Sequence, residues 1–434
     1  MRTTGELEGF YRLMNSDGFT SAQLLEPHRK ATLERAERAG TVLVVHDTTH
    51  VEFTGDAERE GLGVTTNGRQ GFVGHFSLVL DSQCQSVPLG VSHMETYTRT
   101  GKKWAIAKKT RTRVRDDPKR ESLRWWRAVE AFEVDRESRF EAIHVMDAEA
   151  DFFELLSQMV SSDARFIVRA GQLDRSVTAN GEATKLREFA DSLPALLQRT
   201  VELSARRYVG KRQPATTKKR HPARDARLAE LSVAAGRLTL RKTRYSKTGH
   251  DVEINVLRIW EPKPPRGAPP VEWVLLTTEP VETSSDIEQI VDWYRQRWVI
   301  EEFFKALKTG CALEVRQLES YSALVKATAI LAPIAYRLLL LRGMERRHPD
   351  ERPASFFTPT ELMLMLTDDS NRGASPPKTL SDAMRLLARM GGHLKSNGPP
   401  GWLTLSRGYQ HLLTLQSGWE MATGGFSRER SDQS

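Results

Sequence analysis

The pattern of apolar and polar positions predicts alternating helices and strands in the first part of the chain. Apolar residues at helical spacing predict helices, and short continuous runs of β-branched and apolar residues predict buried strands. The expected elements, in chain order, are two helices within 5–38, strands at 41–46, 71–81 and 86–95, a helix from Ser122, a strand at 140–147, a helix at 150–160 and a strand at 165–170.

The second part of the chain has a different pattern. Between about 199 and 279, short alternating segments are separated by turns that contain Gly and Pro, which predicts an antiparallel β-rich block. A long helix is expected from Ser284 to about Thr309, and a second from about Tyr321 to Arg346. The order of these elements predicts an α/β fold in which a β-strand insertion interrupts a mixed sheet.

Composition excludes several classes of protein. The 434 residues carry a net charge of +8, with 39% hydrophobic and 28% charged residues, as is typical of a core-forming chain. The N-terminus lacks the apolar region of a signal peptide, and two cysteines cannot build a disulfide framework. The most apolar stretch, Ala327 to Leu341, is interrupted by Pro333 and Arg337, so no membrane span is expected. Secreted miniproteins, membrane proteins and disordered chains are therefore excluded.

The basic charge is concentrated in two runs. Residues 99–127 hold twelve Lys and Arg against three acids, and residues 205–224 hold eight Lys and Arg with no acid. A solvated loop could explain either run by itself. Two such runs, the first of them interleaved with Trp104, Trp125 and Trp126, favour a surface that contacts the phosphates of a nucleic acid.

Two carboxylates follow buried-type strands and suggest a metal site. Asp47 closes the strand at 41–46, and Asp147 closes the strand at 140–147. If these strands are neighbours in the sheet, the two carboxylates repel each other and a divalent cation is the natural counter-ion. Oxygen ligands favour Mg²⁺ or Mn²⁺. Either residue could instead be a turn former or a helix cap.

The predicted long helix carries a polar stripe. At about 100° per residue, five polar side chains fall within an arc of roughly 80°; they are Tyr294, Arg297, Glu301, Lys305 and Lys308. Glu302 points about 100° away from Glu301. The stripe could be a solvated face with ion pairs such as Glu301 to Lys305. Its flanks are strongly apolar, however, and a polar stripe on a buried helix is costly unless it lines a site.

With these three motifs, the sequence resembles a known family. HDTT at 46–49, DAEAD at 147–151 and the spacing of Tyr294, Arg297, Glu301 and Lys308 are similar to the three motifs of the bacterial cut-and-paste DDE transposases of the insertion-sequence-four family. The likeness runs from about residue 6 to at least residue 345. The resemblance implies an RNase H-like catalytic domain with a β-strand insertion before the last catalytic residue.

The resemblance also implies roles for individual residues. Asp47, Asp147 and Glu301 match the catalytic triad that binds the metal, Mg²⁺ with Mn²⁺ possible. The residues that match DNA-contacting positions are Tyr294, Arg297, Lys305, Lys308, Arg169, Trp273 and Trp298, with Trp273 stacking on a flipped base and Trp298 near it. The implied partners are double-stranded DNA, as transposon ends and target, and a second copy of the chain in a homodimer. The implied location is the bacterial cytoplasm, in association with the nucleoid.

The resemblance implies a reaction sequence as well. One strand is cut by water, and the new 3′-hydroxyl attacks the opposite strand to form a hairpin. The hairpin is reopened, and the same hydroxyl then attacks target DNA.

The expected divisions of the chain follow from the same likeness. They are a residual helical N-terminal region at 1–40, a first part of the catalytic domain at 41–198, a β-rich insertion at 199–279, a second catalytic part with the Glu helix at 280–346, and a helical C-terminal region at 347–434, which is expected to dimerise and to end in a disordered tail. Family members usually carry a longer N-terminal domain that recognises the transposon ends. The alternatives to an active transposase are therefore an N-terminally truncated regulator that inhibits a full-length transposase by mixed assembly, and a metal-dependent nuclease.

Overall fold

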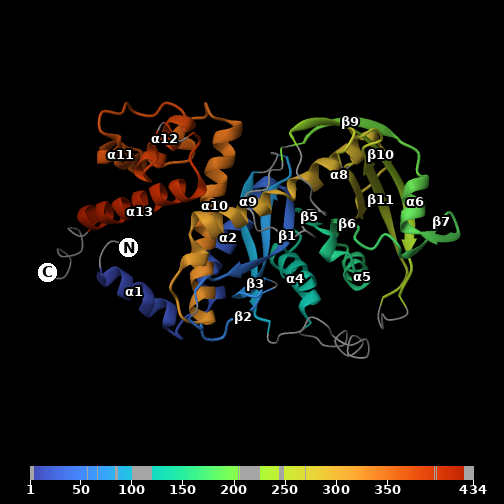
Figure 1. Ribbon diagram of the computed structural model, residues 1–434, viewed down its shortest axis with the longest axis horizontal. Helices are drawn as coiled ribbons and strands as arrows, with labels where there is room; N and C mark the ends of the chain where they lie inside the picture. The colour runs from blue at the N-terminus through green and yellow to red at the C-terminus, as the bar shows by residue number, and fades with distance from the viewer. Residues whose placement is uncertain are drawn as a thin grey trace. The chain divides into compact units, whose positions relative to one another are not determined.

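The computed structural model of the protein describes most of the chain (Figure 1). The described residues are 4–55, 57–65, 67–83, 87–99, 120–203, 205, 225–243, 249–268, 270–394, 396 and 398–424. The greater part of both predicted basic runs, Trp104 and the predicted disordered tail from 425 lie outside them. The chain divides into two compact units, the first formed by 1–42, 47–105 and 298–434 and the second by 43–46 and 106–297.

The N-terminal part of the first unit agrees with the predicted element order. It contains α1 (Thr4–Asn15), α2 (Ser21–Ala39), β1 (Thr41–Glu52), β2 (Gly63–Val64), β3 (Gln70–Asp81) and β4 (Pro88–Tyr97). Thr20 caps α2 by accepting a hydrogen bond from the backbone N–H of Gln23. The strands are ordered β2–β3–β1, and β4 pairs with β3 in antiparallel register. Nearly every residue of β3 is buried, which places this strand in the core.

The first strand is longer than the sequence suggested. We expected a strand at 41–46 closed by Asp47, but β1 continues to Glu52, so Asp47 lies in the middle of the strand. The reason is visible in the residues that follow, because Thr48, Thr49 and Val51 are β-branched and continue to fit a pleated, half-buried surface. The side chain of Asp47 is accordingly held by a rigid strand rather than by a turn.

The C-terminal part of the first unit is helical. Its elements are α9 (Val299–Lys305), the π-helical turn η3 (Ala306–Gly310), η4 (Leu313–Val315), α10 (Tyr321–Arg347), η5 (Pro353–Ser355), α11 (Pro359–Thr367), η6 (Asp369–Asn371), α12 (Leu380–Met390) and α13 (Trp402–Gly424). Among the described residues, α10 is the one helix long and apolar enough to cross a membrane by length and composition. Because 72% of its apolar window is buried inside the protein, packing in the core accounts for that composition.

The second unit is built on a mixed sheet. Residues 43–46 of β1 lead into the strand order β1–β5–β6–β12–β11–β10–β7–β8, with β9 paired to β10. The strands are β5 (Glu141–Met146), β6 (Arg165–Arg169), β7 (Ser176–Ala179), β8 (Glu182–Lys185), β9 (Leu197–Leu203), β10 (Arg227–Leu240), β11 (Val252–Trp260) and β12 (Glu272–Thr277). β5 and β6 are parallel, whereas the pairs from β6 to β12 and onward are antiparallel. The mixed α/β fold is thus confirmed, and the short hairpin β7–β8 is an addition that the sequence did not predict.

Helices cover this sheet. They are η1 (Glu121–Leu123), α4 (Arg124–Arg136), η2 (Ala148–Ala150), α5 (Phe153–Ser161), α6 (Leu186–Ser192) and α8 (Ser284–Gln296). Trp125 of α4 is only 1% exposed, and it packs in one core cluster with Val129 and Met146 while Trp126 lies against that cluster. Both had been assigned to a phosphate-contacting surface. That assignment is wrong for Trp125, because helical periodicity turns its indole into the core even though the surrounding sequence is basic. Trp126 is only partly buried, so its assignment stays a prediction.

The predicted long helix from Ser284 is also interrupted. α8 ends at Gln296, a turn occupies Arg297 and Trp298, and α9 begins at Val299 before the π-helical turn η3. Backbone hydrogen bonds of the tighter i to i−3 type mark the break, from Arg297 N to Tyr294 O at 3.1 Å and from Glu301 N to Trp298 O at 3.1 Å. The stripe was deduced for one uninterrupted helix, which the structure instead divides into two at Arg297 and Trp298.

Candidate active site

The first unit contains the surroundings of Asp47. The Asp47 side chain is 8% exposed, and its Oδ1 accepts a hydrogen bond from the backbone N–H of Thr48 at 2.7 Å. The Thr48 hydroxyl lies 2.9 Å from Nδ1 of His75, a fully buried residue of β3. These contacts fix the orientation of the Asp47 carboxylate within the strand.

Lys308 links the two sequence motifs of the first unit. Its ammonium donates a hydrogen bond to the backbone carbonyl of His50 in β1 and lies 3.8 Å from the Glu314 carboxylate. Burial lowers the pKa of Lys308, while the carboxylates of Glu314, Glu52 and Glu301 act to raise it. The structure thus brings Lys308 and Glu301, both predicted site residues, into electrostatic contact beside the strand that carries Asp47.

Lys305 has a different neighbour from the one that the helical stripe suggested. Its ammonium lies 2.6 Å from Glu302, in an i,i+3 pair, rather than beside Glu301. The Lys305 side chain is 54% exposed. An exposed pair of this kind contributes little to stability, so Lys305 can exchange its partner for another anion at low cost.

Four other predicted residues of the second unit lie around Tyr294. This phenol is 6% exposed, and its ring lies 5.9 Å from the Trp273 ring at an interplanar angle of 62°. Burial raises the pKa of Tyr294, and the neighbouring Arg297 and Arg169 act to lower it while Asp147 acts to raise it. Two guanidiniums and one carboxylate therefore lie within electrostatic reach of a single buried hydroxyl.

Asp147 and Asp151, the two acids of DAEAD, have different environments. Asp147 follows β5 and is half-buried, and its Oδ1 accepts the backbone N–H of Glu149 at 2.9 Å, so it does cap the short helix η2. Asp151 is 2% exposed; its Oδ2 accepts the N–H groups of Gly171 and Gln172 at 2.7 and 2.8 Å, and its other oxygen pairs with Arg175. Asp151 thus holds the loop that follows β6.

The two predicted stacking aromatics are accessible to different degrees. Trp298, in the first unit, is 57% exposed, which is unusual for an indole. Trp273, in β12, is half-buried and pairs in register with Ile259 of β11. The half-buried indole of Trp273 can still present a ring face to a base, and the exposed indole of Trp298 can serve as a stacking surface.

The sequence reasoning missed a buried hydrogen-bonded chain in the second unit. Nε2 of His46 lies 2.8 Å from Nδ1 of His144, and Nε2 of His144 lies 3.0 Å from Glu133, which is also bound by Arg136 at 2.6 Å. Both imidazoles are fully buried. The available signal was a histidine shortly before each motif aspartate, His46 before Asp47 and His144 before Asp147.

The three predicted metal ligands are divided between the units. Asp47 and Glu301 belong to the first unit and Asp147 to the second. Within the described part of the chain, no three His, Cys, Asp or Glu side chains are grouped closely enough to hold a metal ion. A metal site built from these three carboxylates is therefore a proposal.

Comparison with known proteins adds a family match and one structural likeness. The chain is similar to the cryo-EM structure of a piggyBac transposase synaptic complex with hairpin DNA, with 10% sequence identity and a TM-score of 0.30; the alignment covers 94% of this chain and 65% of that chain. A TM-score this low does not establish a shared fold. The family model described as Transposase DDE domain matches residues 133–337, which include Asp147 and Glu301. Residues 133–337, a little under half of the chain, are thus similar to a transposase DDE domain.

Proposed function

We propose that the protein is a DNA transposase of the insertion-sequence-four family that works by a cut-and-paste mechanism. In this proposal an RNase H-like catalytic domain cleaves transposon ends and joins them to target DNA, and the protein acts as a homodimer on paired ends. The observation that carries the proposal is the match of residues 133–337 to a transposase DDE domain. The contacts of Tyr294 with basic and acidic neighbours give further support.

The proposed catalytic and metal-binding residues are Asp47, Asp147 and Glu301. Carboxylate oxygens are the ligands that Mg²⁺ prefers, and Mn²⁺ accepts the same set. One oxygen of Asp47 and one of Asp147 are fixed by backbone N–H groups, at 2.7 and 2.9 Å, which orients both carboxylates. When bound, a pair of such ions supplies an activated water and charge stabilisation for the leaving oxygen of a phosphodiester.

The basic residues are proposed to hold the DNA strand. A guanidinium binds a phosphate through two parallel hydrogen bonds, which suits Arg169 and Arg297 beside Tyr294. The exposed ammonium of Lys305 suits a phosphate contact. Lys308 is more buried, and its bond to the His50 carbonyl suits a residue that positions β1 and adds positive charge near Glu301.

The two tryptophans are proposed to bind a base that leaves the helical stack. Such a base needs an aromatic surface, and stacking on one is worth about 1–3 kcal/mol. Trp298 offers an exposed indole, and Trp273 lies beside Tyr294. This proposal assigns both rings to the tight bend of a DNA hairpin.

The proposed function can be tested with the full chain and a supercoiled plasmid that carries the DNA flanking the gene on both sides. With Mg²⁺ we expect nicking, release of the flanked segment and joining to a second plasmid. Asp47→Asn, Asp147→Asn and Glu301→Gln should each abolish cleavage while leaving the circular dichroism spectrum and melting temperature unchanged.

Glu302→Gln is the matched control, because it removes the neighbouring carboxylate on the same helix. It should retain far more cleavage than Glu301→Gln. Equal loss in the two variants would overturn the assignment of Glu301, and absence of any cleavage or joining by the unaltered chain with Mg²⁺ or Mn²⁺ would overturn the transposase proposal itself.

A further inference from the structure

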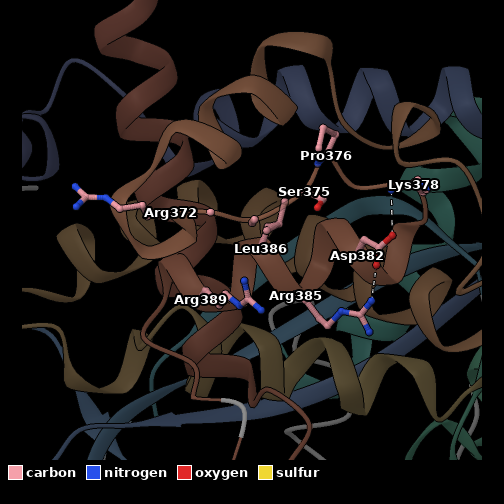
Figure 2. Close-up of a pocket in the computed structure, with 10 residues that line it drawn as sticks. Arg372, Ser375, Pro376, Lys378, Asp382, Arg385, Leu386 and Arg389 are labelled. Atoms are coloured by element: carbon pink, nitrogen blue, oxygen red, sulfur yellow. Dashed lines mark hydrogen bonds and ion pairs between the residues drawn. The ribbon is translucent and has the colours of Figure 1, made fainter.

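A polar pocket lies in the helical C-terminal part of the first unit, in residues to which the proposed reaction gives no task. It has a volume of about 440 Å³ and is lined by the segment from Arg372 to Lys378 and by one face of α12 (Figure 2). Its volume is in the range of ligand-binding sites. Four of its lining side chains are cations, namely Arg372, Lys378, Arg385 and Arg389, against one acid, Asp382.

The cations differ in whether they already have an acidic partner. Arg372 lies 2.8 Å from Asp369, and Arg385 pairs with Asp382. For the guanidinium of Arg389 and the ammonium of Lys378, no ion pair occurs with any described residue. Both residues are exposed. Two cations without a carboxylate partner at one pocket leave a local excess of positive charge that favours an anion.

The single acid of the pocket is committed to a structural role. Oδ2 of Asp382 accepts the backbone N–H groups of Lys378 and Thr379, each at 3.0 Å, and its Oδ1 binds Arg385 (Figure 2). Burial acts to raise the pKa of Asp382, but these hydrogen bonds outweigh it and lower the pKa. Its negative charge therefore caps α12 and holds Arg385 in place.

The pocket is held in shape from both ends of the lining segment. Asn371, just before it, is 1% exposed and donates to the carbonyls of Met365 and Leu386 at 2.9 and 3.1 Å. Thr379, just after it, forms the capping box of α12 with Asp382. A site whose backbone is fixed before binding loses little conformational entropy when a ligand enters.

We propose that this pocket binds backbone phosphates of double-stranded DNA, as a second contact separate from the predicted catalytic residues. None of the ten described residues that line it is aromatic, so it offers no surface for stacking a base. Phosphate groups, by contrast, need only cations and backbone dipoles. The inference rests on the proposed function for its partner, because that function already requires the chain to bind DNA.

The test compares DNA binding by the full chain and by pocket variants over a range of salt concentrations. The probe is a fluorescent duplex of arbitrary sequence, and binding is read by fluorescence anisotropy between about 50 and 200 mM NaCl. The double variant Lys378→Gln with Arg389→Gln removes two proposed phosphate contacts. We expect the slope of log binding constant against log salt concentration to fall by about 2 in magnitude, and binding at about 50 mM salt to weaken at least about tenfold. Lys263→Gln with Arg266→Gln is the matched control, since it removes one exposed Lys and one exposed Arg outside the pocket.

A second pair of variants leaves every cation in place. Ser375 is exposed and lines the pocket, so Ser375→Glu introduces a negative charge there and Ser375→Gln introduces the same bulk without charge. We expect weaker DNA binding from Ser375→Glu alone. Equal slopes for the pocket variant, the control variant and the unaltered chain would overturn the proposal.

Two further measurements distinguish a small-anion site from a failure of the proposed function. If the pocket variants lose binding of inorganic phosphate, measured by calorimetry, while their DNA binding is unchanged, the site takes a small anion and the DNA proposal is wrong. If the unaltered chain binds no DNA at any salt concentration, the proposed transposase function fails, and that outcome is seen without any pocket variant.

Discussion

The buried chain of hydrogen bonds behind the sequence motifs gives a prediction about stability and pH. Glu133 of α4 is mostly buried, with its side chain 21% exposed, and it accepts hydrogen bonds from His144 at 3.0 Å and Arg136 at 2.6 Å. Burial acts to raise its pKa, but the hydrogen bonds and charges of these two partners lower the pKa from 4.5 to about 2. The ionised carboxylate is therefore stabilised by folding.

The size of the effect follows from that pKa. A carboxyl that titrates near 4.5 when unfolded and near 2 when folded contributes about 3 kcal/mol to the free energy of unfolding at neutral pH. Because the folded pKa is the lower one, this stability is fully present above about pH 5 and is lost as the pH falls toward 2. About 2 kcal/mol of it should be gone at pH 3.

The perturbation is Glu133→Gln, which keeps the shape of the side chain and removes its charge. Urea unfolding at several pH values from 3 to 7, followed by circular dichroism, should show a loss of up to about 3 kcal/mol near pH 7 that shrinks steadily toward pH 3. Glu130→Gln is the control, because Glu130 is an exposed residue of the same helix. It should change stability by less than about 0.5 kcal/mol.

Two results would refute this reasoning. A difference between Glu133→Gln and the unaltered chain that stays constant from pH 3 to pH 7 would show that the carboxylate gains nothing from folding. Equal effects of Glu133→Gln and Glu130→Gln would show that the contacts with His144 and Arg136 do not fix the charge.

The proposed DNA-binding residues give three more predictions. Trp273→Ala should slow hairpin formation on an end-containing duplex more than it slows the first nick, by a factor of about 5 to 150, which is the contribution of stacking. Both products can be resolved on a denaturing gel, and equal slowing of the two steps would make Trp273 a packing residue. Removing the charge of Arg297, or separately that of Lys305, should lower by about 1 the slope of log binding constant against log salt concentration. An unchanged slope would exclude a phosphate contact by that residue. Lys308→Met should lower the melting temperature at pH 7, because the carbonyl of His50 loses its hydrogen-bond donor and Glu314 loses its cation partner; an unchanged melting temperature would contradict this.

Much of the fold could be predicted because local patterns and tertiary packing agree. The helix expected at Tyr321 to Arg346 is found at Tyr321–Arg347, and its apolar residues are buried as their spacing implied. The strand expected at 165–170 is found at Arg165–Arg169. The spacing of apolar residues reflects which side chains are buried, so long apolar elements with clear ends can be predicted from the sequence.

The errors in the predicted elements have different physical origins. The break at Arg297 and Trp298 contains neither Pro nor Gly, so no local signal marks it. The extension of β1 follows from the β-branched Thr48, Thr49 and Val51, which the prediction of a strand ending at Asp47 did not take into account. Trp125 was assigned from the charge of its neighbours along the chain, although its helical face decides what it contacts.

In the candidate site, the role of a single side chain depends on surroundings that a sequence motif does not give. The motif DAEAD contains two aspartates; the sequence favours Asp147 only by its place at the end of a strand, and the structure shows that their surroundings differ. The carboxylate of Asp151 is 2% exposed and is already bound by two backbone N–H groups and by Arg175, so coordinating a metal would break contacts that hold the loop after β6. Asp147 is more exposed, caps only a short turn through one oxygen, and lies within electrostatic reach of Tyr294. Of the two acids, Asp147 is therefore the better match to the proposed role at the metal, and Asp151 is the one that keeps its surroundings in place.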